Sequence, residues 1–229
     1  EDEEFWSSGM TADLITKVAG AGLIRVAPLD DILKLDKDLT IEEKAEKLRV
    51  KYILTHSFLI KDDGFDLWCK LENIENGVAL FSNKISEPMS MATQMVGKLA
   101  NDIVISLKVK TKQDVMKAPT TNVEAYEFYL KAKHTYEKRE NTDDTEIAQG
   151  LLYKAIEIDN NLLVAKDLLG TTYYEIGDYG KAMKIYISTL IKSEELDNKL
   201  WIGRILRKIG NIYYDKGDLD LSLDYYERS

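Results

Sequence analysis

Cysteine, histidine and long apolar runs are all scarce in this chain of 229 residues. The single cysteine, Cys69, excludes a disulfide framework within the chain and most cysteine-based metal sites. No stretch reaches the roughly 18 consecutive apolar residues that a membrane span requires. The acidic start at Glu1 to Glu4 is unlike a signal peptide. The two histidines, His56 and His134, belong to different predicted domains, so the sequence predicts no metal site and no cofactor.

Basic residues are outnumbered by acidic ones, which gives a formal net charge of −9. A protein of this charge is poorly suited to a nucleic-acid partner held through phosphate contacts. Hydrophobic residues make up 45% of the chain and charged residues 31%, which is a normal globular balance. Composition therefore favours folded domains without a membrane span and without a nucleic-acid partner.

Tyrosine divides the chain into two regions, because only Tyr52 precedes residue 120 and the other twelve of the thirteen follow it. The polar stretch Lys108–Asn122, which contains Pro119, is the natural boundary. We therefore predict an α/β (α+β) domain over residues 1–110, a linker over 111–122 and an all-α domain over 123–229.

The first region alternates helix and strand patterns. Thr11 is predicted to cap a short helix, and residues 23–27 to form a buried strand. Thr40 and Glu43 form a capping box that opens the next helix, and residues 50–60 read as a long strand. Together with the strands that follow, this pattern predicts a mixed sheet.

The middle of the first region predicts an antiparallel meander. Asp63-Gly64 favours a tight hairpin turn, and apolar and polar side chains alternate along the strand after it. A third strand is expected over residues 78–85, and a helix begins near Ser90. Cys69 falls on the apolar side of its strand, as a buried thiol would, and Trp68 falls on the polar side, where it would need a cover.

The second region contains an internal repeat. Leu169-Gly170-x-x-Tyr173 is followed by Gly177, Ala182 and Tyr186, and the same spacing returns 40 residues later at Ile209-Gly210-x-x-Tyr213, Gly217, Ser222 and Tyr226. This is the spacing of tetratricopeptide repeats, in which small residues let paired helices approach and aromatic side chains fill the adjoining space. It predicts a solenoid of about three repeats, the last without a capping helix, with a longer helix or loop across Ser193–Asn198.

The repeat register also predicts a partner-binding surface. Positions 2, 5, 9 and 12 of the first helix of each tetratricopeptide pair face the concave groove. The groove wall would bind a protein or peptide partner, although the same positions could be an ordinary solvated face, and self-association of the chain is a further possibility. The predicted groove residues are Val164, Asp167, Thr171, Tyr174, Arg204, Arg207, Asn211 and Tyr214.

Catalytic motifs are missing from the pattern. Gly20-x-Gly22 lacks the third glycine of a dinucleotide-binding loop, and Ser7-Ser8-Gly9 is not a nucleophile elbow. The carboxylates are scattered over predicted turns and helix surfaces. We therefore predict that this chain is not an enzyme and has no catalytic residue; an unrecognised active site in the first region is the competing hypothesis.

Three segments of the first region resemble a bacterial domain family described as TolB amino-terminal-like. Phe5–Ile15 is similar to the family's F-x-D-G-(L/M)-T-(E/A)-D-(L/I)-(I/L) opening. Ala45–Leu54 is similar to its A-x-x-L-x-V-x-Y-(V/I)-L segment, and Leu71–Phe81 to its second hairpin. His56-Ser57 stands where the family commonly has Gly-Ser, and the family's first strand, V-A-V-L-P-F, is missing.

The resemblance carries an implied context. Members of this family are often followed by tetratricopeptide repeats, and Ala125–His134 resembles their A-Y-(E/D)-x-Y-L junction. The pair commonly accompanies a class III adenylate or guanylate cyclase domain. The resemblance thus implies a non-catalytic regulatory part of a larger bacterial signalling protein in the cytoplasm. The alternatives are an extracytoplasmic envelope scaffold or secretion-associated binding module, and the regulatory part of a transcription regulator or protein kinase.

Overall fold

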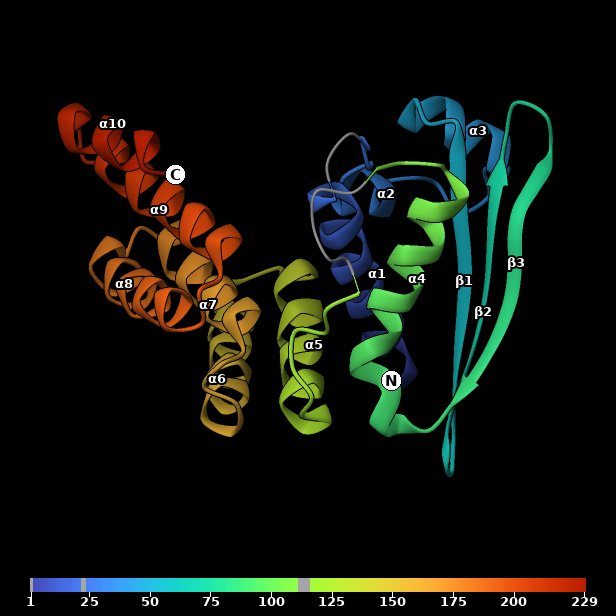
Figure 1. Ribbon diagram of the computed structural model, residues 1–229, viewed down its shortest axis with the longest axis horizontal. Coiled ribbons are helices and arrows are strands. Elements are labelled where there is room, and N and C mark those ends of the chain that lie inside the picture. Colours follow the sequence, from blue (N-terminus) through green and yellow to red (C-terminus); the bar gives the residue numbers. More distant parts are fainter. Residues whose placement is uncertain (1, 22–23, 111–115) are drawn as a thin grey trace. The chain divides into compact units, whose positions relative to one another are not determined.

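The computed structural model describes residues 2–21, 24–110 and 116–229 (Figure 1). The chain divides into two compact units, Glu1–Val123 and Glu124–Ser229. The first unit combines helices with one sheet, and the second is helical throughout. An α+β domain followed by an all-α solenoid is therefore the fold class, as the sequence predicts.

The first unit packs two long helices against one face of a three-stranded sheet (Figure 1). Its elements in chain order are α1 (Asp2–Gly20), α2 (Leu29–Leu33), α3 (Ile41–Leu48), β1 (Tyr52–Lys61), β2 (Gly64–Asn73), β3 (Val78–Glu87), the short 3₁₀ turn η1 (Met89–Met91) and α4 (Ala92–Ser106). Helices α1 and α4 lie side by side and cover the sheet, and α3 contacts β1.

The sheet is an antiparallel meander in the order β1-β2-β3. Phe58 of β1 lies opposite Leu67 of β2, which in turn lies opposite Ile85 of β3. Alternation places Phe65, Leu67, Cys69 and Leu71 on the covered face, each at most 3% exposed. The predicted meander, its turn at Gly64 and the buried thiol of Cys69 are confirmed.

The helix cap that the sequence predicts at Thr11 is wrong. Thr11 does not cap a helix, because α1 begins nine residues earlier and the Thr11 hydroxyl donates to the carbonyl of Ser7, 2.7 Å away. Trp6 stacks on Phe58 at 6.0 Å between ring centroids, and Trp6 is only 2% exposed. This packing holds a Ser-Ser-Gly stretch of low helix propensity in helical form.

The strand predicted over residues 23–27 is also not found. Leu23 lies outside the described residues, and Ile24–Ala27 pair with no strand in the described part of the chain. A strand exists only through hydrogen bonds to a neighbour, so an apolar run alone does not make one. The guanidinium of Arg25 instead donates to the carbonyl of Arg49 at 3.1 Å. The predicted mixed sheet is therefore antiparallel throughout the described residues.

The second unit is a series of antiparallel helices. They are α5 (Val123–Glu137), α6 (Thr142–Ile158), α7 (Leu163–Glu175), α8 (Tyr179–Glu195), α9 (Lys199–Asp215) and α10 (Leu219–Glu227). Helix α6 packs on α7, α7 on α8, α8 on α9 and α9 on α10, so these five helices each contact the next one along the chain. The 40-residue spacing of the two repeats is taken up by helix: α8 runs to Glu195, and α9 begins eleven residues before Gly210, whereas α7 begins seven residues before Gly170.

The repeat residues pack as the pattern predicts. A Cβ atom on Gly170 would collide with the ring of Tyr186, and one on Gly210 would lie 2.8 Å from the ring of Tyr226. Both turn glycines have left-handed backbones, with φ of 79° at Gly177 and 81° at Gly217. Close approach of the two helices within each repeat therefore depends on Gly170 and Gly210, and the turn between the helices on Gly177 and Gly217.

Candidate partner-binding surface

The eight predicted groove residues lie on two neighbouring helices, α7 and α9. Arg207 and Tyr214 are exposed, Tyr214 to 60%. Asp167, in contrast, is only 4% exposed. The other five predicted residues are half-buried: Val164, Thr171, Tyr174, Arg204 and Asn211. The predicted surface thus divides into an open part, Arg207 and Tyr214 on α9, and a closed part around Asp167, between α7 and α9.

The closed part is a charged network that joins α7 to α9. Asp167 forms ion pairs with Arg204 at 2.9 Å and with Lys208 at 2.7 Å, and Lys208 also donates to the hydroxyl of Thr171 at 2.5 Å. Burial lowers the pKa of Lys208, while the neighbouring carboxylate of Asp167 opposes that shift. Asp167 is therefore occupied by its own chain and is not free to bind a partner while these pairs are closed.

Lys208 is the residue that position counting missed. It lies one turn after Arg204, at a position that the groove pattern does not include. Its ammonium lies 5.5 Å from the centre of the Tyr186 ring, so the side chain reaches across the boundary between two repeats. The i, i+4 spacing of Arg204 and Lys208 is the sequence signal that could have found it.

Tyrosine hydroxyls make a second set of contacts along the same wall. Tyr174 of α7 donates a hydrogen bond to the carboxylate of Asp215 on α9, and this bond together with burial raises the pKa of Tyr174 to about 12. Tyr226 donates to the side-chain oxygen of Asn211 at 2.7 Å, much as the hydroxyls of Tyr186 and Thr171 meet at 3.4 Å one repeat earlier. Tyrosine hydrogen bonds thus join α7 to α9 and α9 to α10 along this wall.

Helix α9 carries more positive than negative charge on a chain of net negative charge. Lys199, Arg204, Arg207 and Lys208 are set against Asp215 alone. Arg207 is the exposed one of the three central cations, and it forms no ion pair with any residue that the structure describes. An exposed guanidinium near the phenol of Tyr214 can bind carboxylates or peptide carbonyls.

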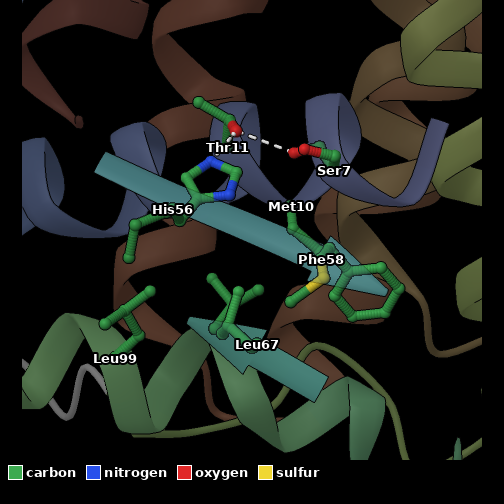
Figure 2. A pocket seen from close by; sticks show the side chains of 9 residues that line it. Ser7, Met10, Thr11, His56, Phe58, Leu67 and Leu99 are labelled. Carbon is green, nitrogen blue, oxygen red and sulfur yellow. Dashed lines mark hydrogen bonds between the residues drawn. The ribbon is translucent and has the colours of Figure 1, made fainter. Parts of the chain in front are cut away.

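Two hollows lie among the described residues of the first unit, and neither has convergent catalytic groups in its lining. The smaller one, between α1, the sheet and α4, has a volume of about 10 Å³ (Figure 2). Such a volume holds about one water molecule. In it Nε2 of His56 lies 2.6 Å from the Thr11 hydroxyl, and burial lowers the pKa of His56. This contact joins α1 to β1, and which of the two atoms donates depends on the tautomer of His56.

The other hollow is open and lies on the uncovered face of the sheet. Its volume is about 390 Å³, and Trp68, Lys70 and Lys84 line it. Lys84 lies over the Trp68 ring, 5.0 Å from its centre. The sequence predicts that Trp68 needs a covering group, and within this unit Lys84 covers it in part, since Trp68 remains 38% exposed.

Asp66, on the same strand, binds Lys61, Lys84 and Ser86. Hydrogen bonds from Lys61 and Ser86 hold the pKa of Asp66 well below its usual range.

Within the described ranges no group of three or more histidine, cysteine or acidic side chains is placed to hold a metal ion. The thiol of Cys69 is buried, which raises its pKa and makes it a poor nucleophile. No helix among the residues that the structure describes has the length and apolar character of a membrane span.

Comparison with known proteins finds a partial likeness to solved structures. No family model and no curated protein matches the sequence. A structure described as "Crystal structure of MamA" is 24% identical, over 61% of this chain and 75% of that chain, with a TM-score of 0.40. Another, "Crystal structure of MamA protein", is 23% identical, over 61% of this chain and 70% of that chain, with a TM-score of 0.39. Likeness of this size says nothing about shared partners.

Proposed function

We propose that the helical unit is a protein-interaction module that binds a protein or peptide partner along the wall formed by α7 and α9. The observation that carries this proposal is the pair Arg207 and Tyr214, which stand exposed on a basic helix of an acidic chain. Exposed arginine and tyrosine are the side chains most enriched among residues that dominate binding energies.

The charged network between α7 and α9 supports the same role. Asp167, Arg204 and Lys208 hold two helices in one arrangement before any partner arrives. A surface that is already ordered loses less conformational entropy when it binds, so more of the contact energy appears as affinity. The closed half of the wall thus makes the open half a better binding surface.

Site-specific crosslinking tests this proposal in cells that produce the protein. Benzoylphenylalanine in place of Tyr214 should give a crosslinked adduct of one defined mass, and the adduct should disappear when Arg207→Glu is added. The same amino acid in place of Ile187, which is 45% exposed on α8, is the matched control and should give no such adduct. Equal adducts from both positions, or no effect of Arg207→Glu, would reject the wall as the binding surface.

We further propose that this module regulates a larger bacterial signalling protein with a class III adenylate or guanylate cyclase domain, in the cytoplasm, and has no enzymatic activity itself. The support is the sequence similarity of Phe5–Ile15, Ala45–Leu54 and Leu71–Phe81 to cyclase-associated domains. The sequence of the full-length gene tests it. A secretion or lipid-attachment signal without a cyclase domain would favour the envelope scaffold instead, and a winged-helix or kinase domain the third alternative.

A further inference from the structure

Strand β3 is an outer strand of the three-stranded sheet (Figure 1). It pairs with β2 from Val78 to Glu87, and no strand among the described residues pairs with its other side. Seven of its ten residues are exposed and none is buried. The strand contains no proline, and its one bulge lies near its beginning, at Leu80. A long edge of this kind is a template for pairing with another strand.

The hairpin between β1 and β2 determines the direction of the backbone groups in the sheet. Its loop, Asp62-Asp63, has two residues, and the closing pair of such a hairpin, here Lys61 and Gly64, exchanges both hydrogen bonds. Even-numbered residues of β2 therefore direct their N–H and C=O groups to β1. The amide of Ile74 agrees with this, since it donates to the carbonyl of Lys51 at 2.9 Å.

The same alternation continues across the sheet to β3. Odd-numbered residues of β2 bond to β3, and Cys69 lies opposite Asn83. The odd-numbered residues of β3 therefore direct their backbone groups inward, to β2. Ser82, Lys84 and Ser86 direct their N–H and C=O groups outward, where no described strand receives them. This edge thus offers alternating donors and acceptors at a spacing that only another strand matches.

A second copy of β3 fits this edge in antiparallel orientation. Outward groups meet outward groups in registers that are two-fold symmetric about one residue. Symmetry about Lys84 sets two ammonium groups opposite each other, which is unfavourable. Symmetry about Ser82 moves the pairing into the bulge at Leu80. Symmetry about Asn83 pairs each Ser82 with a Lys84 and each Ser86 with a Leu80, so it is the register that satisfies the edge.

The side chains on the covered face of the sheet match in the same register. Phe81 of one copy lies opposite Ile85 of the other, and both are half-buried in the single chain. Helix α4 adds to this side, because Lys98 forms an ion pair with Glu87 of β3 at 3.1 Å. Ile105 lies two turns further along the same side of α4 and is 64% exposed. The second copy would cover this apolar margin.

This self-complementarity identifies a second copy as the occupant of the edge. The segments that adjoin β3, the turn at Gly77 and the η1–α4 segment, are already placed elsewhere in the unit. A strand of unrelated sequence would use the backbone groups alone. The matching of Ser82 with Lys84 and of Phe81 with Ile85 is a property of β3 facing itself.

We propose that β3 pairs with β3 of a second copy of this chain, antiparallel and symmetric about Asn83, so that the two sheets join into one continuous sheet. The inference goes beyond the proposed function, because it assigns a homodimer contact to the first unit, whereas the α7 and α9 wall belongs to the second.

Disulfide crosslinking at single positions tests the register in the full-length gene product. The background is Cys69→Ala, since the native thiol lies opposite Asn83 and would compete. Asn83→Cys should form a disulfide-linked dimer under mild oxidation, because the two Cα atoms of such a pair lie about 4.5 Å apart. Ser82→Cys and Lys84→Cys should crosslink at least about fivefold less, because their own copies lie diagonally, about 7 Å apart. Asp62→Cys, exposed in the other hairpin, is the control and should give no dimer.

A proline at the outward edge tests the backbone contact itself. Ser82→Pro removes one outward amide and leaves the hydrogen bonds to β2 in place. Sedimentation velocity should show a dimer for the wild type. Ser82→Pro should raise the dissociation constant about thirtyfold, because the symmetric contact loses one hydrogen bond in each copy. Ser82→Ala keeps the amide and should leave the constant unchanged, and circular dichroism shows whether both variants keep their secondary structure.

The inference fails if Asn83→Cys gives no dimer, which is also the result expected if another segment of the full-length chain covers β3. It fails equally if positions 82, 83 and 84 crosslink to the same extent, or if Ser82→Pro leaves the dimer intact, since association would then use another surface. The crosslink at position 214 tests the proposed function independently, because it reports on the second unit.

Discussion

The repeat α7–α8 and the repeat α9–α10 have the same small and aromatic residues at the same spacing, yet they differ in how firmly they are held. Gly170 meets Tyr186 and Gly210 meets Tyr226, so contacts within a repeat are the same in both. Contacts between repeats are not, because Asp167 is paired across the boundary and Arg207 is exposed. Packing inside a repeat is thus a property of the repeat, whereas its charged residues depend on the neighbour.

The largest expected difference between the repeats concerns their glycines. Gly170→Trp should cost about 3 kcal/mol or more and unfold the helical unit, because Tyr186 is enclosed and has no room to move. Gly210→Trp should cost less, about 2 kcal/mol, because the partly exposed ring of Tyr226 can swing aside, whereas the backbone carbonyl of Ser222, 3.3 Å from an added Cβ, cannot. Urea unfolding followed by circular dichroism measures both.

Ala182→Trp provides the control for this comparison, since Ala182 is fully buried in α8 and should behave like Gly170. Equal losses for Gly170→Trp and Gly210→Trp would contradict the claim that the two repeats are held differently.

The next difference concerns the residues at positions 167 and 207. Asp167→Ala should destabilise the helical unit by about 2 kcal/mol, because it leaves Arg204 and Lys208 without a counter-charge in a partly buried site. Arg207→Ala removes an exposed side chain and should change stability by less than about 0.5 kcal/mol. The free energy of unfolding in urea measures both.

The double variant Asp167→Ala, Lys208→Met separates the causes in this second comparison. If the unpaired ammonium is the source of the loss, removing it should restore part of the stability. A double variant less stable than Asp167→Ala would instead assign the loss to packing.

A smaller difference concerns the tyrosines. Tyr174→Phe deletes the hydrogen bond to Asp215 and should cost about 0.5 kcal/mol, since the bond is near the surface. Tyr214→Phe, at the equivalent exposed position, should be neutral within the error of the measurement. Thermal unfolding of the two variants side by side tests this, and a larger loss from Tyr214→Phe than from Tyr174→Phe would contradict the difference.

Much of the fold could be predicted from local sequence patterns. The alternation along β2, the turn at Gly64 and the glycine and tyrosine spacing of the repeats all report short-range geometry, and each is confirmed. The start of α1 could not be predicted in this way, because the contact of Trp6 with Phe58 joins residues far apart in the sequence. The strand predicted over residues 23–27 is not found for a related reason, since a strand forms only by hydrogen bonding to a neighbouring strand.

The candidate site could be predicted only in part, because the spacing of residues along one helix can be read from the sequence and contacts between helices cannot. Counting helix positions predicts that Arg207 and Tyr214 belong to a groove wall, and both side chains are exposed on α9. Counting cannot show that Asp167 is closed by Arg204 and Lys208, because that contact depends on how near two helices come to each other. Which of the predicted residues are open to a partner therefore follows from the contacts between repeats.

The smallest expected effect is the dependence of the tyrosine contact on pH. The bond to Asp215 raises the pKa of Tyr174 to about 12, above the value of about 10 for an unfolded chain. A raised pKa favours the protonated phenol in the folded state, so its contribution to stability is complete below pH 10 and is lost as the pH rises toward 12. The difference in melting temperature between the wild type and Tyr174→Phe should therefore shrink between pH 10 and pH 12, by about 1 to 2 °C. A difference that stays constant over this range would mean that the phenol is not held by the carboxylate, and that α9 is joined to α7 by the Asp167 network alone.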